Sequence, residues 1–349
     1  MNSFLKILLT LFSILLFLNC KKGTSPINGT DIPSNLQVSA TVSTDGSGNV
    51  TFSASATNAT SFRYEFGDGG NQTVAGGNLT YKYKTAGTNT YAVNVTAFSS
   101  SGGSIAKSIS ITITVVAMPP SLFWSDEFDI NGAPDPLKWG YDIGTGSGGW
   151  GNGELQYYTS RQENVVIQNG NLKITAIKES FSGSAYTSTR MISKTKFEFT
   201  YGKIEVRAKL PAGLGTWPAV WMLGSNISTA GWPSCGELDI VEHRGSELNK
   251  IFGTLHYPGR SGGNADGSTK FISNATTEFH TYAVDWSASS IKIYVDDELY
   301  HTVVNSNSIP FNQNFFFLIN LAIGGSFGGS VDPAFVNASL EVDYIRVYK

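Results

Sequence analysis

The stretch GELDIVEH, residues 236–243, sets three acidic residues into a short apolar run. Side chains of a strand alternate between its two faces, so Glu237 and Asp239 share a face. Glu242 lies three positions after Asp239 and would point to the other face of a regular strand. A β-bulge at either residue between Asp239 and Glu242 adds one position and returns Glu242 to the face of the other acids. The spacing therefore predicts a bulged strand with three carboxylates on one surface.

Three carboxylates on one surface are typical of a glycosidase. Like charges a few ångströms apart repel, which raises the pKa of at least one acid and keeps it protonated. At ~3.3 Å per residue the glutamate Cα atoms lie about 13 Å apart, so inward-leaning side chains can approach the roughly 5–5.5 Å of a retaining pair. We assign Glu237 as the nucleophile and Glu242 as the acid/base. Asp239 is expected to hydrogen-bond the nucleophile and to help keep Glu242 protonated; a solvated strand face is the alternative.

The N-terminal residues have the pattern of an export signal. A strongly apolar run without charges, residues 7–18, follows a lysine and is too short to span a bilayer comfortably. We expect residues 1–19 to be a signal peptide, Cys20 to be lipidated, and residues 20–33 to form a flexible tether. This predicts a surface-exposed lipoprotein of the bacterial cell envelope, with the lipid as its only link to the membrane. Asn19 is larger than the usual residue before a lipidated cysteine, so simple cleavage and secretion is the alternative.

The chain has only two cysteines, Cys20 and Cys235. If Cys20 is acylated, no intramolecular disulfide forms, and the fold must depend on its hydrophobic core. Cys235 lies next to the acids, but no general base is placed to activate it as a nucleophile. A lone cysteine at the start of a buried strand is normally a small hydrophobic residue.

Composition and charge exclude several classes of function. A net charge of -3 with 15% charged residues gives no basic surface for nucleic acid or for a membrane. No segment shows a sustained 3.6-residue apolar period, and short runs rich in Val, Ile, Phe and Tyr recur between Gly, Asn, Ser and Thr, which predicts an all-β fold. The four histidines do not share metal-site spacing, so we expect no catalytic zinc and no cofactor for catalysis.

Residues 34–117 predict one immunoglobulin-like β-sandwich, because about seven alternating runs fit such a domain. The stretch YEFGDGG, residues 64–70, and the Tyr-containing strand that follows it resemble the PKD domain family, with Tyr64 where that family usually has Trp. Within this stretch Phe66-Gly67-Asp68-Gly69 is expected to be a strand that runs into a tight turn. We interpret the domain as a spacer, with glycan binding as the alternative.

Residues 118–349 predict a second, larger domain of two packed antiparallel sheets. Consecutive prolines at 119 and 120 mark its start, since they fit neither a helix nor a central strand. Three tryptophans, Trp217, Trp221 and Trp232, precede the acidic strand, and aromatic rings stack on the apolar faces of sugars. Trp217 and Trp232 each precede a proline and are expected at the edges of a groove, whereas Trp221 fits a core position equally well.

The second domain resembles the laminarinase-type enzymes of glycoside hydrolase family 16. The resemblance rests on WSDEFD at 124–129, WGNGELQYYT at 150–159, the run 201–223, GELDIVEH, and VDYIRVY near the end. It implies a concanavalin-like jelly-roll β-sandwich, retaining endo-hydrolysis of β-glucans, and the same roles for the three acids. It also implies substrate-binding positions: Asn152, Glu154, Arg190, Trp217, Trp221, Trp232, His256 and Asn320.

Two further features follow from the resemblance. Family enzymes often hold a structural calcium ion, and Glu127, the backbone of Gly170, and Asp343 match its ligand positions. Hydrogen bonds alone around those acids are the alternative. The sequence departs from the family where Ser326 and Phe327 follow the terminal Gly-Gly, because laminarinases commonly have Asn-Trp there.

We predict a monomer that cleaves internal β-1,3 bonds of laminarin-like glucans, with mixed-linkage glucan as a secondary substrate. Agarose is the chief alternative substrate, because agarases share the bulged acidic motif. A non-catalytic glucan-binding lectin, a structural adhesin and a polysaccharide lyase are the other candidates. Glu237 and Glu242 argue against a lectin or an adhesin, and a lyase would favour a basic cleft instead.

Overall fold

The computed structural model describes residues 31–116 and 120–349, which are nearly all β-structure. Contacts within the chain divide it into two compact units between Pro119 and Pro120. The predicted signal peptide and the lipidation site Cys20 lie outside the described residues. Among the described residues, no helix is long and apolar enough to cross a membrane. The all-β prediction is confirmed.

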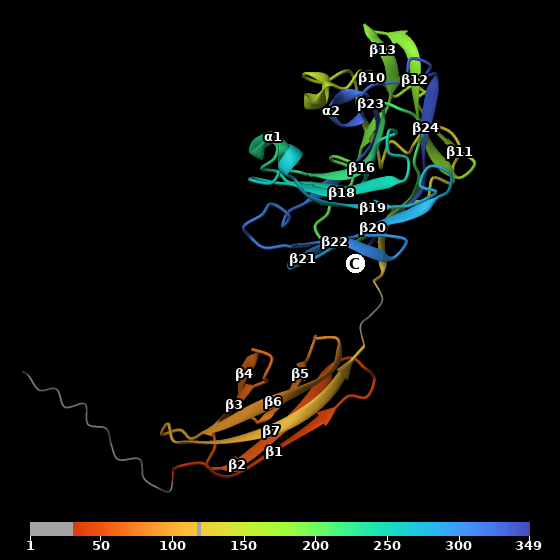
Figure 1. Ribbon diagram of the computed structural model, residues 1–349. Helices are drawn as coiled ribbons and strands as arrows, with labels where there is room; N and C mark the ends of the chain where they lie inside the picture. Colours follow the sequence, from red (N-terminus) through yellow and green to blue (C-terminus); the bar gives the residue numbers. More distant parts are fainter. Residues whose placement is uncertain (1–30, 117–119) are drawn as a thin grey trace, which may run out of the picture. The chain divides into compact units, whose positions relative to one another are not determined.

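The first unit is a sandwich of two antiparallel sheets, as predicted for an immunoglobulin-like domain (Figure 1). One sheet has the strand order β1-β2-β5 and the other β4-β3-β6-β7. The strands are β1 (Ser34–Val42), β2 (Asn49–Thr57), β3 (Ser61–Glu65), β4 (Asn71–Val74), β5 (Asn78–Lys82), β6 (Gly87–Phe98) and β7 (Ser104–Val115). Alternating side chains such as Val50 and Phe52 of β2 point inward and are fully buried.

The Phe66-Gly67-Asp68-Gly69 stretch forms the tight turn that the sequence predicts. The Asp68 carboxylate accepts hydrogen bonds from the Gly70 N–H at 2.9 Å and from the Tyr81 hydroxyl at 3.0 Å. Phe66 stacks on Tyr81 with 3.6 Å between ring centroids. These contacts tie the turn to β5 and give the acid a structural role.

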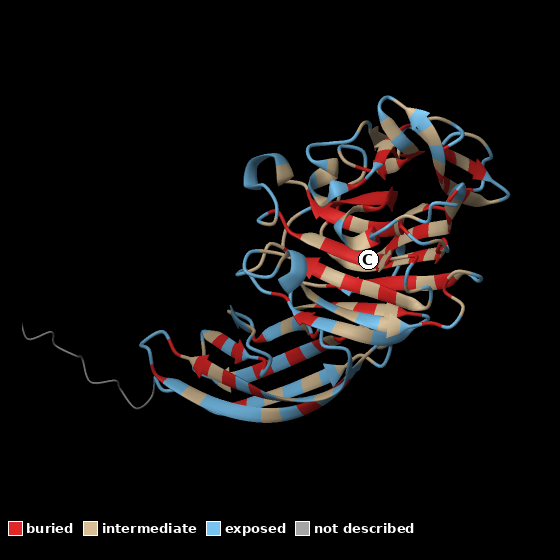
Figure 2. Cartoon of the chain, turned by 45° about the horizontal axis from the view of Figure 1, so that its top comes forward, coloured by how far each residue is buried: buried red, intermediate tan, exposed pale blue. Residues whose placement is uncertain are grey.

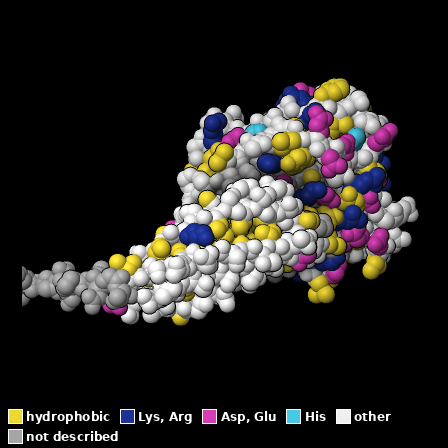
Figure 3. Space-filling view, turned by 90° about the horizontal axis from the view of Figure 1, so that it is seen from below, with side chains coloured by type: hydrophobic (Ala, Val, Ile, Leu, Met, Phe, Trp, Pro, Cys, Tyr) yellow, Lys and Arg dark blue, Asp and Glu magenta, His cyan; other side chains and the backbone are white. Residues whose placement is uncertain are grey.

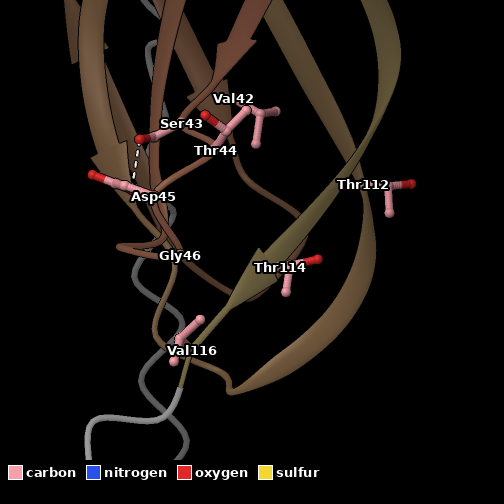
Figure 4. Close-up of a pocket in the computed structure, with 8 residues that line it drawn as sticks. All are labelled: Val42, Ser43, Thr44, Asp45, Gly46, Thr112, Thr114 and Val116. Carbon is pink, nitrogen blue, oxygen red and sulfur yellow. Dashed lines mark hydrogen bonds between the residues drawn. The ribbon is translucent and has the colours of Figure 1, made fainter.

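The surface of the first unit is polar and carries few charges. Figure 3 shows a face of the molecule on which charged side chains are sparse over part of the surface, and the strands β6 and β7 are rich in Ser and Thr. A shallow surface pocket lies beside the turn after β1 (Figure 4). Its lining includes Ser43, Asp45, Thr112 and Thr114 but no aromatic ring, and the Asp45 carboxylate already accepts the Ser43 hydroxyl at 2.6 Å. The pocket therefore gives no support to glycan binding.

The second unit contains two large sheets (Figure 1). The ten-stranded sheet follows the order β10-β13-β12-β24-β15-β20-β21-β22, with β11 paired to β12 and β8 to β24. Its strands are β8 (Leu122–Asp126), β10 (Gln156–Tyr158), β11 (Val165–Gln168), β12 (Asn171–Phe181), β13 (Ser184–Ser188), β15 (Gly202–Lys209), β20 (His280–Trp286), β21 (Ser290–Val295), β22 (Glu298–Val304) and β24 (Asn337–Tyr348).

The seven-stranded sheet of the second unit has the order β19-β18-β17-β16-β23-β14-β9. Its strands are β9 (Gly140–Asp142), β14 (Arg190–Ile192), β16 (Thr216–Gly224), β17 (Glu237–His243), β18 (Lys250–His256), β19 (Asp266–Phe271) and β23 (Phe315–Ile323). The acidic strand β17 is thus close to the middle of this sheet. The short elements are η1 (Gly149–Gly153), α1 (Ile227–Ala230), η2 (Gly262–Asn264) and α2 (Gly325–Gly328).

The core of the second unit lies between its two sheets. Alternate side chains of the central strands enter it, including Val220 and Met222 of β16 and Phe317 and Ile319 of β23. Figure 2 shows buried positions as red bands along the strands. The opposite face of the seven-stranded sheet carries a small apolar cluster of Leu223, Cys235, Phe316 and Leu318. The predicted jelly-roll architecture is confirmed, and it leaves that opposite face free for the acids.

Candidate active site

Strand β17 contains the predicted bulge. From Asp239 to Glu242 the chain takes three steps, while the paired residues of β16 run only from Trp221 to Ala219 and those of β18 from Thr254 to Phe252. The two residues between the acids, Ile240 and Val241, both lie in the core. Glu242 therefore returns to the outer side of the sheet with Glu237 and Asp239. We call this side the acid face.

Glu237 and Glu242 are each held by the indole N–H of a tryptophan. Trp217 Nε1 donates to Glu242 Oε1 at 2.9 Å, and Trp232 Nε1 donates to Glu237 Oε2 at 2.9 Å. Trp217 is on β16 and Trp232 is on the loop before β17, so the two carboxylates are fixed from different elements. The Trp217 and Trp232 rings thus lie beside the acids, where the sequence analysis placed them for sugar stacking.

Burial dominates the electrostatics of the three acids. Burial, and after it the charge of Asp239, raises the pKa of Glu237 to about 8. Burial raises the pKa of Asp239 well above its usual value, with the charge of Glu242 as a second cause. Burial also raises the pKa of Glu242, and the Trp217 N–H opposes that shift. The three groups titrate as one coupled unit, which holds protons at pH values where isolated carboxylic acids are ionised.

Asp239 does not form the hydrogen bond to the nucleophile that the sequence analysis expected. Its Oδ2 atom is buried and has no hydrogen-bond partner among the described residues. His256 of β18 lies beside it, with Nε2 3.4 Å from Asp239 Oδ2 and 3.7 Å from Glu237 Oε1. These three side chains also form the only group of metal-ligating residues found within the described part of the chain.

A chain of buried hydrogen bonds connects Trp221 to Glu154. Trp221 Nε1 donates to Asn320 Oδ1 at 2.7 Å, and Asn320 Nδ2 donates to the Tyr158 hydroxyl at 3.1 Å. That hydroxyl donates to Glu154 Oε2 at 3.0 Å. The Glu154 carboxylate also accepts the side-chain amides of Gln156 and Asn152, so both of its oxygens are occupied. Glu154 is 8% exposed and orients Asn152, Tyr158 and, through them, Asn320.

Arg190 is clamped between two indole rings. Its guanidinium carbon lies 4.5 Å from the Trp150 ring centroid and 4.9 Å from that of Trp221, and its Nε donates to Asp142 Oδ2 at 3.0 Å. Arg190 pairs in register with Asn320, which pairs with Ala219, the neighbour of Glu242. A row across the sheet therefore connects the arginine to the acid/base.

Phe327 of α2 occupies the end of the acid face next to Glu242, where the sequence departs from the family pattern. Its ring packs on Trp217 at 5.2 Å and meets Phe252 edge-on at 5.0 Å. The guanidinium of Arg244 lies over both phenylalanine rings, at 5.1 and 5.2 Å from their centroids. Phe327 thus supports the indole that holds the acid/base.

Cys235 is fully buried, and burial raises the pKa of its thiol to about 11. A thiol in this state is protonated at neutral pH and is a poor nucleophile. Its backbone carbonyl accepts the Gln313 side-chain amide at 2.8 Å. These contacts agree with the structural role expected from the sequence.

The three positions assigned to calcium lie close together in register. Strand β24 pairs Val342 with Leu172 and Ile345 with Asp126, which brings Gly170, Asp343 and Glu127 to one side of the ten-stranded sheet. Each of the two carboxylates already has a guanidinium partner. Glu127 Oε2 lies 2.7 Å from Arg346 Nη2, and Asp343 pairs with Arg207. The oxygen donors suit calcium, which would have to compete with these arginines, and the ion stays a prediction.

Comparison with known proteins identifies the family of the second unit. Residues 152–346 match the model of glycosyl hydrolases family 16. The chain belongs to that family. Residues 25–115 match the model of a PKD domain, so the resemblance of the first unit is also confirmed.

Three relatives of this family 16 chain are informative. A beta-glucanase of Rhodothermus marinus is 44% identical over 245 residues, which cover 65% of this chain and 85% of that protein. The catalytic domain of an endo-1,3-beta-glucanase (laminarinase) from Thermotoga petrophila RKU-1 is 41% identical, with a TM-score of 0.63, and covers 67% of this chain and 99% of that one. SCLam, a non-specific endo-beta-1,3(4)-glucanase, is 39% identical with a TM-score of 0.63, over 67% of this chain and 93% of that one.

The structure brings the predicted acids and substrate-binding residues of this family 16 chain to the acid face or directly beneath it. Trp150, Tyr158 and Phe252 were not predicted from the sequence, although Trp150 packs on Arg190 and Tyr158 bonds to Asn320. Phe327 was noted only as a departure from the family, and the structure packs it between Trp217 and Phe252. Trp150 and Tyr158 lie inside the quoted WGNGELQYYT motif, so the motif itself was a usable signal. Phe252 is opposite Glu242 on β18, a pairing that only the strand register reveals.

Replacing Asp239 by Asn should shift the pH dependence of hydrolysis toward acid. The charge of Asp239 raises the pKa of Glu237, so its loss lets the nucleophile ionise at lower pH. Loss of the same charge makes Glu242 easier to ionise, so the alkaline limb of kcat/KM also moves down. A kcat/KM profile of Asp239→Asn should therefore lie at lower pH than the wild-type profile. Asp285→Asn, at an exposed position of β20, is the control and should leave the profile unchanged; an alkaline shift in Asp239→Asn contradicts the assignment.

Replacing Trp150 by Ala should weaken substrate binding more than turnover. The change removes one of the two rings that clamp Arg190, and a cation–π contact contributes about 0.5–2 kcal/mol, which corresponds to a roughly 2- to 30-fold rise in KM. Trp150→Phe keeps a ring over the guanidinium and should restore most of the affinity. Steady-state kinetics of the two variants check this, and an unchanged KM in Trp150→Ala would show that the clamp does not position Arg190 for the substrate.

Proposed function

We propose that this family 16 chain is a retaining endo-glucanase that hydrolyses internal β-1,3-glucosidic bonds of laminarin-like glucans. The observation that supports this most strongly is the bulge in β17, which sets Glu237 and Glu242 on one face of the sheet. Each glutamate is fixed there by an indole N–H. The names of the relatives, laminarinase and beta-glucanase, support the same substrate class.

The proposed reaction has two displacement steps, with Glu237 as the nucleophile and Glu242 as the acid and then the base. Glu242 donates its proton to the glycosidic oxygen while ionised Glu237 attacks the anomeric carbon, which forms a covalent glycosyl-enzyme and releases the leaving sugar. Glu242, now ionised, removes a proton from water, and the water oxygen displaces Glu237. The Trp232 N–H favours the ionised form of Glu237 against the effect of burial, and burial raises the pKa of Glu242, which favours the protonated form that donates the proton.

The acid face offers both kinds of contact that a glucan needs. The rings of Trp217 and Trp232 flank the acids and are available for stacking on sugar faces. Arg190 and Asn152 supply N–H donors for hydroxyl groups on the side of β14 and η1. Because SCLam acts on both linkages according to its name, mixed-linkage β-1,3-1,4-glucan is the proposed secondary substrate.

Two alternatives are separated by the site and by experiment. A glucan-binding lectin has no need for three repelling acids, one of them buried and all with a raised pKa. An agarase shares the acidic motif, so the substrate choice between glucan and agarose must be measured.

Loss of either catalytic glutamate should abolish hydrolysis. Glu237→Ala and Glu242→Ala should each lose several orders of magnitude in kcat, and azide should partly restore Glu242→Ala by attacking the glycosyl-enzyme without a base. Glu341→Ala, which removes an acid paired with Lys209 on the ten-stranded sheet, is the matched control and should keep full activity. Proton NMR of the first product should show the β-anomer, and an initial α-anomer contradicts retention.

The same enzyme incubated with laminarin, lichenan, agarose and κ-carrageenan tests the substrate. We expect the fastest release of oligosaccharides from laminarin and slower release from lichenan. Faster release from agarose would contradict the assignment of laminarin as the substrate, but it would not bear on the retaining mechanism of the acids.

We further propose that Cys20 is lipidated and anchors the chain to the bacterial cell envelope, with the PKD-like domain as a spacer. The apolar segment and the cysteine that follows it support this. Cys20→Ser should release active enzyme into the medium, as measured by laminarin hydrolysis in the culture supernatant and in washed cells. A wild-type enzyme that is already soluble, with a mature N-terminus other than Cys20, contradicts the anchor.

A structural calcium ion is proposed at Glu127, Gly170 and Asp343, on the ten-stranded sheet and not among the catalytic acids. If calcium links these positions, a chelator should lower the Tm, and added calcium should restore it, because a ligand that binds only the folded state stabilises that state. Glu127→Gln should abolish the calcium-dependent part of the Tm. A Tm that responds to neither chelator nor calcium would show that the arginine pairs alone hold these acids.

The enzyme is expected to be a monomer.

A further inference from the structure

The two ring nitrogens of His256 face groups of opposite hydrogen-bonding character. His256 is the last residue of β18 and pairs with Glu237 across the strand register. Its Nε2 lies beside the acids, 3.4 Å from Asp239 Oδ2 and 3.7 Å from Glu237 Oε1. Its Nδ1 accepts the backbone N–H of Gly262 at 3.1 Å.

This arrangement determines where the ring proton lies. A neutral imidazole carries one proton, and the nitrogen that accepts a hydrogen bond is the one without it. Since Nδ1 of His256 accepts from Gly262, the proton is on Nε2. The Nε2–H group therefore faces Asp239 and Glu237.

The same tautomer argues against a metal ion among these side chains. With bonds of about 2.0–2.1 Å, two ligand atoms of a tetrahedral zinc ion lie roughly 3.3–3.4 Å apart. The Nε2 atom of His256 lies 3.4 and 3.7 Å from the two carboxylate oxygens, so these distances alone are compatible with a metal ion. A metal would need the lone pair of Nε2, which here carries the proton. A ligating histidine also donates from its other nitrogen, whereas Nδ1 of His256 faces a donor.

We propose that the backbone N–H of Gly262 locks His256 as the Nε2–H tautomer, so that His256 serves as the neutral N–H donor that positions Asp239 and the nucleophile Glu237. The inference rests on the proposed function for the role of Glu237 as nucleophile. Asp239 Oδ2 is the buried atom that lacks a hydrogen-bond partner, and the Nε2–H of His256 is the donor within reach of it. Hydrogen bonds of catalytic groups are often long in ligand-free enzymes and shorten when substrate binds.

The lock is supplied by a loop that is itself closed by hydrogen bonds. Tyr257 and Arg260 exchange backbone hydrogen bonds at 2.8 Å, and the Asn264 side chain donates to the Gly259 carbonyl at 3.0 Å. The Trp232 ring packs near the imidazole at 5.8 Å and sends its own N–H to Glu237. The nucleophile is thus approached by two uncharged N–H donors, which hold an ionised carboxylate without the strong ion pair that would weaken it as a nucleophile.

The tautomer can be read directly by ¹⁵N NMR of the full chain labelled with ¹⁵N-histidine. The chain has four histidines, and the spectrum of His256→Gln identifies the signals of His256 by their loss. We expect a pyridine-type shift for Nδ1 and a pyrrole-type shift with an attached proton for Nε2. A pyrrole-type Nδ1, or displacement of the Nε2 proton by stoichiometric Zn²⁺, would overturn the lock. This readout does not depend on activity, so it stands even if the proposed substrate is wrong.

Kinetics on laminarin tests the positioning role. His256→Gln keeps an N–H donor and should retain kcat within about 10-fold, whereas His256→Leu removes it and should lose about 10- to 100-fold in kcat with a smaller change in KM, the size expected for a lost hydrogen bond to a charged group. His301→Gln is the matched control. His301, on β22, lies against Asp266 and away from the acid face, so this variant should keep the wild-type kcat and KM. Equal kcat values for the Gln and Leu variants would overturn the donor role.

Discussion

One extra residue in strand β17 determines the site. The bulge sends both Ile240 and Val241 into the core between the sheets, and it is their burial that holds Glu242 on the same face as Glu237 and Asp239. Both neighbouring strands skip one position at the same place, so the irregularity is built into the centre of the sheet. The tryptophans, the arginine and the amide network are arranged around the carboxylates that this geometry brings together.

The acid face has a cost in stability that depends on pH. The folded state raises the pKa of all three acids above the values of about 3.9–4.3 that unfolded chains show. Between those values and the folded pKa, the folded chain holds protons that the unfolded chain has lost, so stability falls as the pH rises. For Glu237 this decline extends to about pH 8. The indole N–H groups of Trp232 and Trp217 oppose the shifts of Glu237 and Glu242 and so reduce this cost.

The sequence predicted the bulge, the shared face of the three acids and the two sandwiches, because these depend on local periodicity and on quoted motifs. It did not predict how the side chains meet. The indole donors to Glu237 and Glu242 depend on pairing between separate elements, and His256, on the adjacent strand, is what lies beside Asp239. Trp150 was missed because its backbone is left-handed, with φ of 58°, in a glycine-rich turn that strand periodicity cannot describe.

Glu154 shows the limit of residue-by-residue transfer from a family. It was predicted to bind substrate, and its carboxylate is instead buried and occupied by three donors that orient the residues around it. The burial of a polar motif residue could not be read from the motif, since an alternating polar run predicts an exposed edge equally well.

The central claim is that the bulge makes Glu237 the nucleophile of a retaining reaction. The most direct measurement is to trap the covalent intermediate with a 2-deoxy-2-fluoro laminari-oligosaccharide that carries a good leaving group, and to locate the label by mass spectrometry of the digested chain. The account predicts a single glycosyl ester on the peptide that contains Glu237, at the carboxylate of that residue. A label on Glu242, or turnover of the reagent with no covalent adduct and with inverted product, would contradict it.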